Sequence, residues 1–223
     1  MPIDPNADIE ITSFAWVPDF ARGFVRDLRP RWACEEAGIG YRERLIGFET
    51  AKSEDYRREQ PFGQVPAYRD DEVQMFESGA MVLRIAERSE KLMPGGPAGR
   101  SRVLTWITAA LNSVEPFVFD LVNIDTFNKD AEWGRLRRPQ VIDNLRGRLA
   151  GLSGWLGEKP YLEGDFSAAD IIMTTVLREV SDDTLLAEFP NVVAYRDRCM
   201  QRPAFEQALK AQLASFAPDP VAA

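Results

Sequence analysis

The chain of 223 residues contains no histidine. Imidazole is the general base of Ser-His-Asp and Cys-His catalysis and a common ligand of zinc and iron, so these mechanisms lack an essential group. Chemistry at neutral pH must then rely on a bound co-substrate, on carboxylates or on hydrogen-bond donors. We therefore expect no metal ion in a functional site.

Cysteine is almost as scarce, because Cys34 and Cys199 are the only two and stand far apart. Their spacing predicts neither a disulfide framework nor a dithiol redox centre, and it suits a reducing compartment. No apolar run approaches the length that spans a membrane, and the first residues lack a basic segment followed by an apolar one. We expect a cytoplasmic protein.

Positive charge is in the minority, with 27 Lys and Arg against 35 Asp and Glu and a formal net charge of −8. A general affinity for nucleic acid or for anionic membranes is therefore not expected. Hydrophobic residues make up 45% of the chain, which is ordinary for a globular protein with a packed core.

The organisation changes near residue 90. Before it, β-like runs alternate with helical patterns: a strand at 9–14, a helix at about 25–37 ending at Gly38, a strand at 41–46, and a hairpin of strands 65–68 and 73–76. This order suits a mixed sheet with helices packed on it. Proline and glycine crowd 91–100, which predicts a linker, and helical spacing of apolar residues dominates 101–223.

One motif in the second half is expected to be structural. Ser167 and Asp170 stand three residues apart before an apolar run, which predicts a capping box that starts a buried helix. We assign Asp170 no catalytic role.

Two short motifs carry the chemistry. The segment 62–67 predicts a turn that leads an extended chain into Pro66, whose bond to Val65 can be cis because X-Pro bonds have only a small trans preference. Glu77 and Ser78 stand at the start of an apolar helix, where free N–H groups and the helix dipole favour an anion. A small zwitterionic peptide can use both features at once.

An ordered set of motifs resembles the cytosolic glutathione transferase family over nearly the full length of the chain. The matching segments are 35–39, 60–67, 76–81, 166–170 and 202–205. The resemblance implies a thioredoxin-like α/β domain over 1–90, a linker over 91–100 and an all-α domain over 101–223. It also implies glutathione as co-substrate and a homodimer.

The resemblance implies roles for several residues of the two motifs. Val65 would pair its backbone with the cysteine residue of glutathione as an added strand, which a cis bond at Pro66 permits; the alternative is a plain turn. Ser78 would bind the γ-glutamyl carboxylate and Glu77 would lie near the α-ammonium group. The alternative is an ordinary serine N-cap beside a solvated acid.

Two further residues match less specific positions. Gln64 would bind the ligand backbone or its glycyl carboxylate, and Lys52 would bind that same carboxylate. The alternative for Lys52 is a solvated surface charge.

The residue that usually holds the glutathione sulfur is missing. Family members place Tyr, Ser or Cys after the first strand, but the segment 16–27 contains none of them, and the usual spacing before Glu36 ends near Phe24. Ser13 falls in the predicted strand, and Cys34 falls in the helix as a small packing residue.

Another group must then stabilise the thiolate, because a free thiol has a pKa of about 8.5. Arg22 is the first candidate, with N–H groups of the first helix adding a positive field, and Arg26 is the second. The alternative is that both arginines form ordinary ion pairs. Trp16, Phe20 and Phe24 would line a pocket for an apolar electrophile, unless they belong to the core.

The function expected from the resemblance is conjugation of the glutathione thiolate to a small apolar electrophile, as in detoxification. A second hypothesis is a glutathione-binding but catalytically silent carrier or interaction module. A glutathione-dependent peroxidase or thiol-exchange activity ranks below both.

Overall fold

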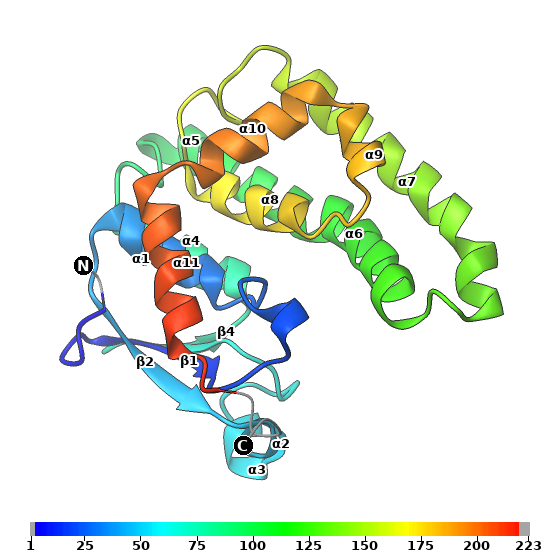
Figure 1. The fold of residues 1–223 in the computed structure, drawn as a ribbon. Helices are drawn as coiled ribbons and strands as arrows, with labels where there is room; N and C mark the ends of the chain where they lie inside the picture. The colour runs from blue at the N-terminus through cyan, green and yellow to red at the C-terminus, as the bar shows by residue number, and fades with distance from the viewer. Residues whose placement is uncertain (1–2, 219–223) are drawn as a thin grey trace. The chain divides into compact units, whose positions relative to one another are not determined.

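The computed structural model describes residues 3–218, whose contacts divide into two compact units. Among the described residues, the first unit comprises 3–92 and 202–218, and the second comprises Met93–Gln201. The last helix, α11 (Pro203–Ser215), therefore belongs to the first unit, whereas the sequence placed it in the helical domain of 101–223. Figure 1 shows α11 in red beside the blue helix α1.

A four-stranded mixed sheet in the order β2-β1-β3-β4 forms the base of the first unit. Its strands are β1 (Ile9–Phe14), β2 (Tyr41–Ile46), β3 (Ala67–Arg69) and β4 (Gln74–Phe76). β1 and β2 are parallel, and β3 is antiparallel to both β1 and β4. The predicted limits of β1 and β2 are confirmed, and so is the thioredoxin-like α/β fold.

Three helices of this unit pack together, α1 with both α4 and α11. The helices before the linker are η1 (Asp19–Ala21), α1 (Leu28–Ala37), α2 (Phe48–Lys52), α3 (Glu54–Arg57) and α4 (Ser78–Ala86). α1 ends at Gly38, whose φ of 67° is left-handed, as predicted. It begins later than predicted, because the Leu28 N–H closes a tight turn on the Val25 carbonyl at 3.1 Å.

The second unit is helical, as predicted. Its elements are α5 (Gly96–Ala109), η2 (Ala110–Val114), α6 (Glu115–Val122), η3 (Asn123–Phe127), α7 (Glu132–Leu156), α8 (Ala168–Arg178), α9 (Asp183–Ala187) and α10 (Pro190–Met200). α5 begins inside the predicted linker, because Pro97 falls in the first helical turn, where its missing N–H has no helical partner to lose.

The capping box at the start of α8 is confirmed. The Ser167 hydroxyl accepts the Ala169 N–H at 3.3 Å, and the Asp170 carboxylate accepts the Ser167 N–H at 2.8 Å. Asp170 also accepts the Tyr195 hydroxyl at 2.9 Å, and burial raises the pKa of the aspartate. These bonds make Asp170 a structural residue of the helical unit.

Between residues 3 and 218, no helix is both long enough and apolar enough to cross a membrane. The same stretch contains no group of three or more cysteine, aspartate or glutamate side chains placed to hold a metal ion.

The buried Asp70 side chain forms hydrogen bonds with both the β3–β4 hairpin and α4. Its side chain accepts the backbone N–H groups of Val73 at 2.9 Å and Glu72 at 3.0 Å, the Tyr68 hydroxyl at 3.0 Å, and Nε of Arg84 at 3.1 Å. Burial alone would raise the pKa of Asp70, but these hydrogen bonds outweigh it and lower the pKa to about 2. The ionised form therefore stabilises the junction from which α4 starts.

We expect Asp70→Asn to lower the free energy of unfolding by about 2 kcal/mol at neutral pH. Because the folded pKa lies below the unfolded one, this contribution is fully present above the unfolded pKa and is lost as pH falls through the folded pKa. The difference between variant and wild type should shrink to about half near pH 3, measured by urea unfolding. Asp71→Asn, at the exposed neighbour, is the control and should show neither effect.

Candidate functional site

Three chain segments that carry site candidates lie at one end of the sheet. β1 runs parallel to β2, Ile11 of β1 faces Tyr68 of β3 in antiparallel register, and Ala67 of β3 faces Phe76 of β4. The chain that follows Phe14, the turn that precedes Ala67 and the start of α4 therefore lie at the same end. Ligands of open α/β sheets commonly bind at the carboxyl ends of the parallel strands.

Two buried side chains shape the turn before Val65. Oε1 of Gln60 accepts the N–H groups of Phe62 at 2.8 Å and Gln64 at 3.2 Å. The Tyr56 hydroxyl donates to the Gln64 carbonyl at 2.7 Å. The turn therefore has fixed internal partners up to the residue before Val65.

Gly63 is required in this turn. Its φ is 65°, and a Cβ added to it would lie 2.8 Å from the Ala51 carbonyl oxygen. A side chain would therefore both strain the backbone and push the turn away from α2.

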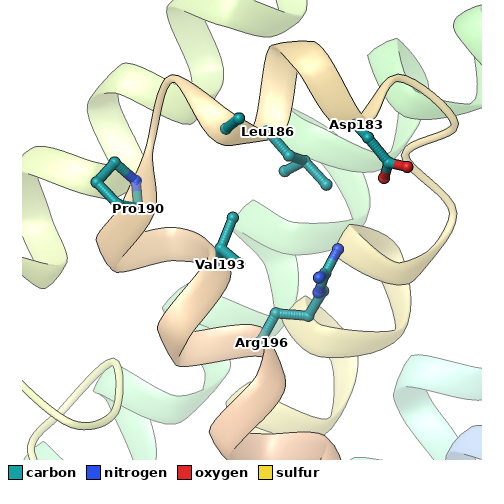
Figure 2. A pocket seen from close by; sticks show the side chains of 6 residues that line it. Asp183, Leu186, Pro190, Val193 and Arg196 are labelled. Atoms are coloured by element: carbon teal, nitrogen blue, oxygen red, sulfur yellow. The ribbon is translucent and has the colours of Figure 1, made fainter.

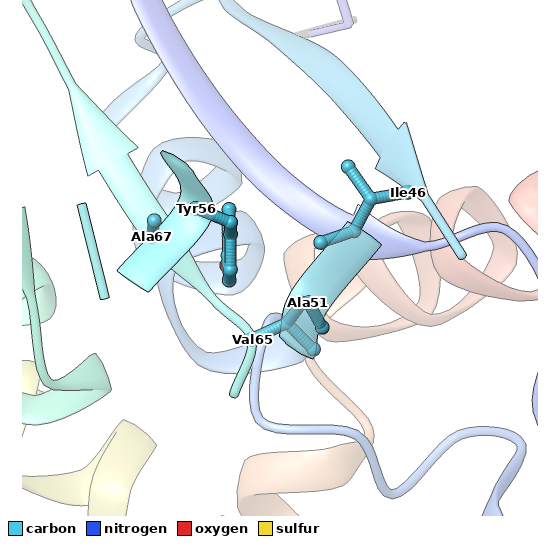
Figure 3. Packing of buried hydrophobic residues seen from close by; sticks show 5 residues of the cluster. All are labelled: Ile46, Ala51, Tyr56, Val65 and Ala67. Atoms are coloured by element: carbon cyan, nitrogen blue, oxygen red, sulfur yellow. The ribbon is translucent and has the colours of Figure 1, made fainter. Parts of the chain in front are cut away.

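Val65 turns its side chain inward and leaves its backbone unpaired. The side chain is 9% exposed and packs in the cluster of Figure 3, here called the Val65 cluster, which consists of Ile46, Ala51, Tyr56, Val65 and Ala67. Phe14 and Val25 pack against this cluster. The bond from Val65 to Pro66 is cis, and within residues 3–218 neither the N–H nor the C=O of Val65 has a hydrogen-bond partner. These two groups suit pairing with an extended peptide.

The start of α4 combines a strained residue with a buried hydroxyl. Glu77 is exposed and has a φ of 73° although it is not glycine, which is a sparsely populated conformation. Ser78 is the first helical residue and is 5% exposed. Nη1 of Arg29, itself 1% exposed, donates to the Ser78 hydroxyl oxygen at 3.1 Å. The hydroxyl can then donate its own proton outward, next to a buried positive charge and the helix N–H groups.

The two less specific candidates are both exposed. Gln64 is bound through its backbone, and Nζ of Lys52 lies 2.9 Å from a carboxylate oxygen of Glu49. Such a surface pair contributes little to stability, and it matches the alternative of a solvated charge for Lys52. Ligand roles for both residues stay predictions.

Arg22 contacts partners within its own unit. Its Nε lies 3.2 Å from a carboxylate oxygen of Asp19, and its Nη2 donates to the Ala217 carbonyl at 3.3 Å. The guanidinium also lies over the ring of Phe216. These contacts fit the alternative in which Arg22 is an ion-pair partner. They fix the position of the Arg22 side chain, which belongs to the loop between β1 and α1. Its role toward a thiolate stays a prediction.

The three aromatic candidates of this loop differ in burial. Phe20 is 60% exposed and Phe24 is 44% exposed, so neither belongs to the core. The Trp16 ring packs edge-on against Phe48, and its indole N–H is buried without a hydrogen-bond partner among residues 3–218. A pocket role for these side chains stays a prediction.

Three other groups that could stabilise a thiolate are buried or already hydrogen-bonded. The Ser13 hydroxyl, 1% exposed, donates to Oδ2 of Asp27 at 2.9 Å. Cys34 is fully buried, and burial raises the pKa of its thiol well above the usual value, so the thiol is unreactive. At the start of α1, the N–H groups of Leu28 and Arg29 donate to backbone carbonyls at 3.1 and 3.2 Å. Arg22, which contacts Asp19 and Ala217, stays the first candidate that the sequence suggested.

A cavity of ≈ 370 Å³ lies in the helical unit beside α9 and α10 (Figure 2). Its lining consists of Asp183, Leu186, Ala187, Pro190, Val193 and Arg196. Nε of Arg196 donates to the neighbouring Asp197 at 2.9 Å, and the lining contains no hydroxyl or thiol. We therefore place the candidate site at the end of the sheet.

The comparisons with known proteins show which family the chain belongs to. The family model described as the glutathione S-transferase N-terminal domain matches residues 21–87. Glutathione S-transferase 1 of Zea mays is 30% identical over 192 residues, which cover 78% of this chain and 86% of the maize protein. The chain belongs to the glutathione S-transferase family.

Two further similar proteins are an oxidoreductase and a glutathione S-transferase of known structure. The disulfide-bond oxidoreductase YfcG of Escherichia coli (strain K12) is 27% identical over 196 residues, covering 80% of this chain and 88% of YfcG. The theta class glutathione S-transferase from the citrus canker pathogen Xanthomonas axonopodis pv. citri, solved with glutathione bound, aligns with a TM-score of 0.77. It is 25% identical, and the alignment covers 93% of this chain and 99% of that one.

Sequence reasoning missed three residues that shape the site. Arg29 and Gln60 are polar side chains that are almost fully buried, and Gln212 comes from the far end of the chain. Arg29 lies in the first turn of a helix that also contains Arg31, Glu35 and Glu36, so its charge did not mark it as a site residue. No local signal points to Gln212, because its partners are more than 180 residues away.

Proposed function

We propose that the chain binds glutathione at this end of the sheet and transfers the glutathione thiolate to an apolar electrophile. The observation that carries the proposal is the meeting of two features in one place: the unpaired backbone of Val65 and the buried Ser78 hydroxyl backed by Arg29. An extended peptide can pair with the first while its carboxylate binds at the second.

Glutathione fits these groups by its chemistry. Its cysteine residue carries one N–H and one C=O, which match those of Val65. Its γ-glutamyl end carries a carboxylate for Ser78 and an ammonium group for the carboxylate of Glu77. Gln64 and Lys52 lie in the segments that would flank the glycyl end.

In the proposed reaction the sulfur anion attacks an electrophilic carbon and a carbon–sulfur bond forms. With an aryl halide the halide departs with its electron pair; with an enone the alkene electron pair moves toward the carbonyl and the resulting enolate takes a proton from solvent. The thiol proton goes to solvent before the attack. Arg22 would favour the anion by its charge, and holding the two reactants together would supply much of the rate. Trp16, Phe20 and Phe24 would contact the apolar part of the electrophile.

A second candidate is disulfide exchange, in which two glutathione thiols reduce a disulfide and leave as glutathione disulfide. The similarity to the disulfide-bond oxidoreductase YfcG favours it. The protein's own cysteines would take no part, because both are buried. That the protein acts as a homodimer in the cytoplasm stays an expectation from the family resemblance.

The test combines binding and turnover. Calorimetric titration with S-methylglutathione should give saturable binding, and glutathione with a dinitrochlorobenzene or an enone should give conjugate. Hydroperoxides and a small disulfide serve as further substrates in the presence of glutathione. Exchange without conjugation would favour the second candidate, and binding without any turnover would favour a carrier. No heat and no thermal shift at millimolar ligand would overturn the proposal.

A further inference from the structure

Residues near the C-terminus form hydrogen bonds with the loop between β1 and α1. Gln212 of α11 is fully buried, and its Nε2 donates to the Val25 carbonyl at 2.9 Å and to Oδ1 of Asp27 at 2.7 Å. The Ala217 N–H donates to the Ala15 carbonyl at 2.7 Å. The last helix and the residues after it therefore bind both ends of the loop that carries Arg22.

The amide of Gln212 has one orientation, because both of its partners are acceptors and only the NH₂ group can face them. Its Oε1 is buried and has no partner within residues 3–218. An unsatisfied buried acceptor costs about 1–3 kcal/mol. A leucine at position 212 could pack α11 against the unit without this cost, because it has no buried oxygen to satisfy. What the amide provides is a fixed backbone turn at 25–27.

Val25 connects this turn to the candidate site. Its carbonyl accepts both Gln212 and the Leu28 N–H, while its side chain packs against the Val65 cluster. Val25 therefore contacts α11, the start of α1 and the Val65 cluster. A shift of the turn would change the distance between the loop and a peptide paired with Val65.

We propose that Gln212 is a positioning residue for the sulfur of bound glutathione. It fixes the turn at 25–27 and, through it, the loop that carries Arg22 beside the Val65 cluster. This inference rests on the proposed function. The γ-glutamyl end would bind at Ser78 on α4, outside the loop that carries Arg22. Loss of the Gln212 amide should therefore affect the thiolate more than the affinity for the tripeptide.

The experiment compares Gln212→Leu with wild type by the ultraviolet absorbance of the thiolate of bound glutathione, titrated against pH. In the variant, we expect the pKa of the bound thiol to rise by about one unit toward the free value of ~8.5. The Kd for S-methylglutathione, which has no thiol proton, should change by less than about threefold. Hydrogen exchange should become faster at 22–27 and stay unchanged in β1 and β2.

The matched control is Gln207→Leu, the same change at an exposed position of α11, which should match wild type in all three measurements. If Gln212→Leu does not fold, Gln212→Asn replaces it, because the shorter amide cannot reach both acceptors. An unchanged thiol pKa in a folded variant would overturn the inference, as would a wild-type thiol pKa at the free value. In both cases the binding proposal stands, whereas a wild type that binds no S-methylglutathione overturns both.

Discussion

Replacing Asp27 with alanine is expected to lower the free energy of unfolding by about 3–5 kcal/mol. Asp27 is 1% exposed and lies 2.7 Å from Nε of Arg31, which is also fully buried. Ser13 and Gln212 donate to the same carboxylate. Without it, the buried Arg31 keeps Glu43 as its remaining acidic partner, and the Gln212 amide loses an acceptor.

Urea unfolding of Asp27→Ala and of a surface control measures this effect. In the control, Asp55→Ala, the lost carboxylate is 91% exposed and pairs at 3.3 Å with Arg58, which is 76% exposed. Such pairs are worth less than about 1 kcal/mol. A loss below about 1 kcal/mol for Asp27→Ala as well would show that the buried pair contributes no more than a surface pair.

Ser78→Asp should weaken binding of S-methylglutathione by at least about a hundredfold, equivalent to ~2.7 kcal/mol. The new carboxylate would repel the γ-glutamyl carboxylate and pair with Arg29 in its place. Stability should not fall, because an acid at a helix N-terminus next to a buried arginine is favourable. Loss of binding with retained stability separates a ligand site from an ordinary helix start.

Calorimetry and thermal unfolding check both halves of this prediction. Ser101→Asp provides the control, since it adds the same charge at an exposed position near the start of α5. Ser78→Ala should show a smaller loss of about tenfold, because it removes a hydroxyl without adding charge. Binding of the ligand to Ser78→Asp at wild-type strength would contradict the placement of the carboxylate.

Much of the fold could be predicted because local patterns carry it. The strand-like runs at 9–14 and 41–46 predicted the limits of β1 and β2. Gly38 marked the end of α1 through its left-handed backbone, and Ser167 marked the start of α8 through its capping hydroxyl. The start of α1 was less predictable, since the turn that delays it depends on Val25.

The site could be predicted in part, for the same physical reason. The motifs around Pro66 and Ser78 are local, and the antiparallel register brings them to one end of the sheet. The side chains that support them are set by distant partners, such as Arg29 behind Ser78 and Gln212 behind Val25. No spacing in the sequence encodes such pairs, which is why Arg22 was noticed while the helix that holds its loop was not.

Glu77 has a left-handed backbone, so stability favours a glycine at this position, whereas the proposed contact with the ligand's ammonium group favours the acid. A non-glycine residue there costs on the order of 1–3 kcal/mol, which a glycine would largely recover. Variants selected for heat tolerance alone should therefore drift toward glycine at this position. Variants selected for retention of a zwitterionic ligand should keep the acid and tolerate the lower melting temperature.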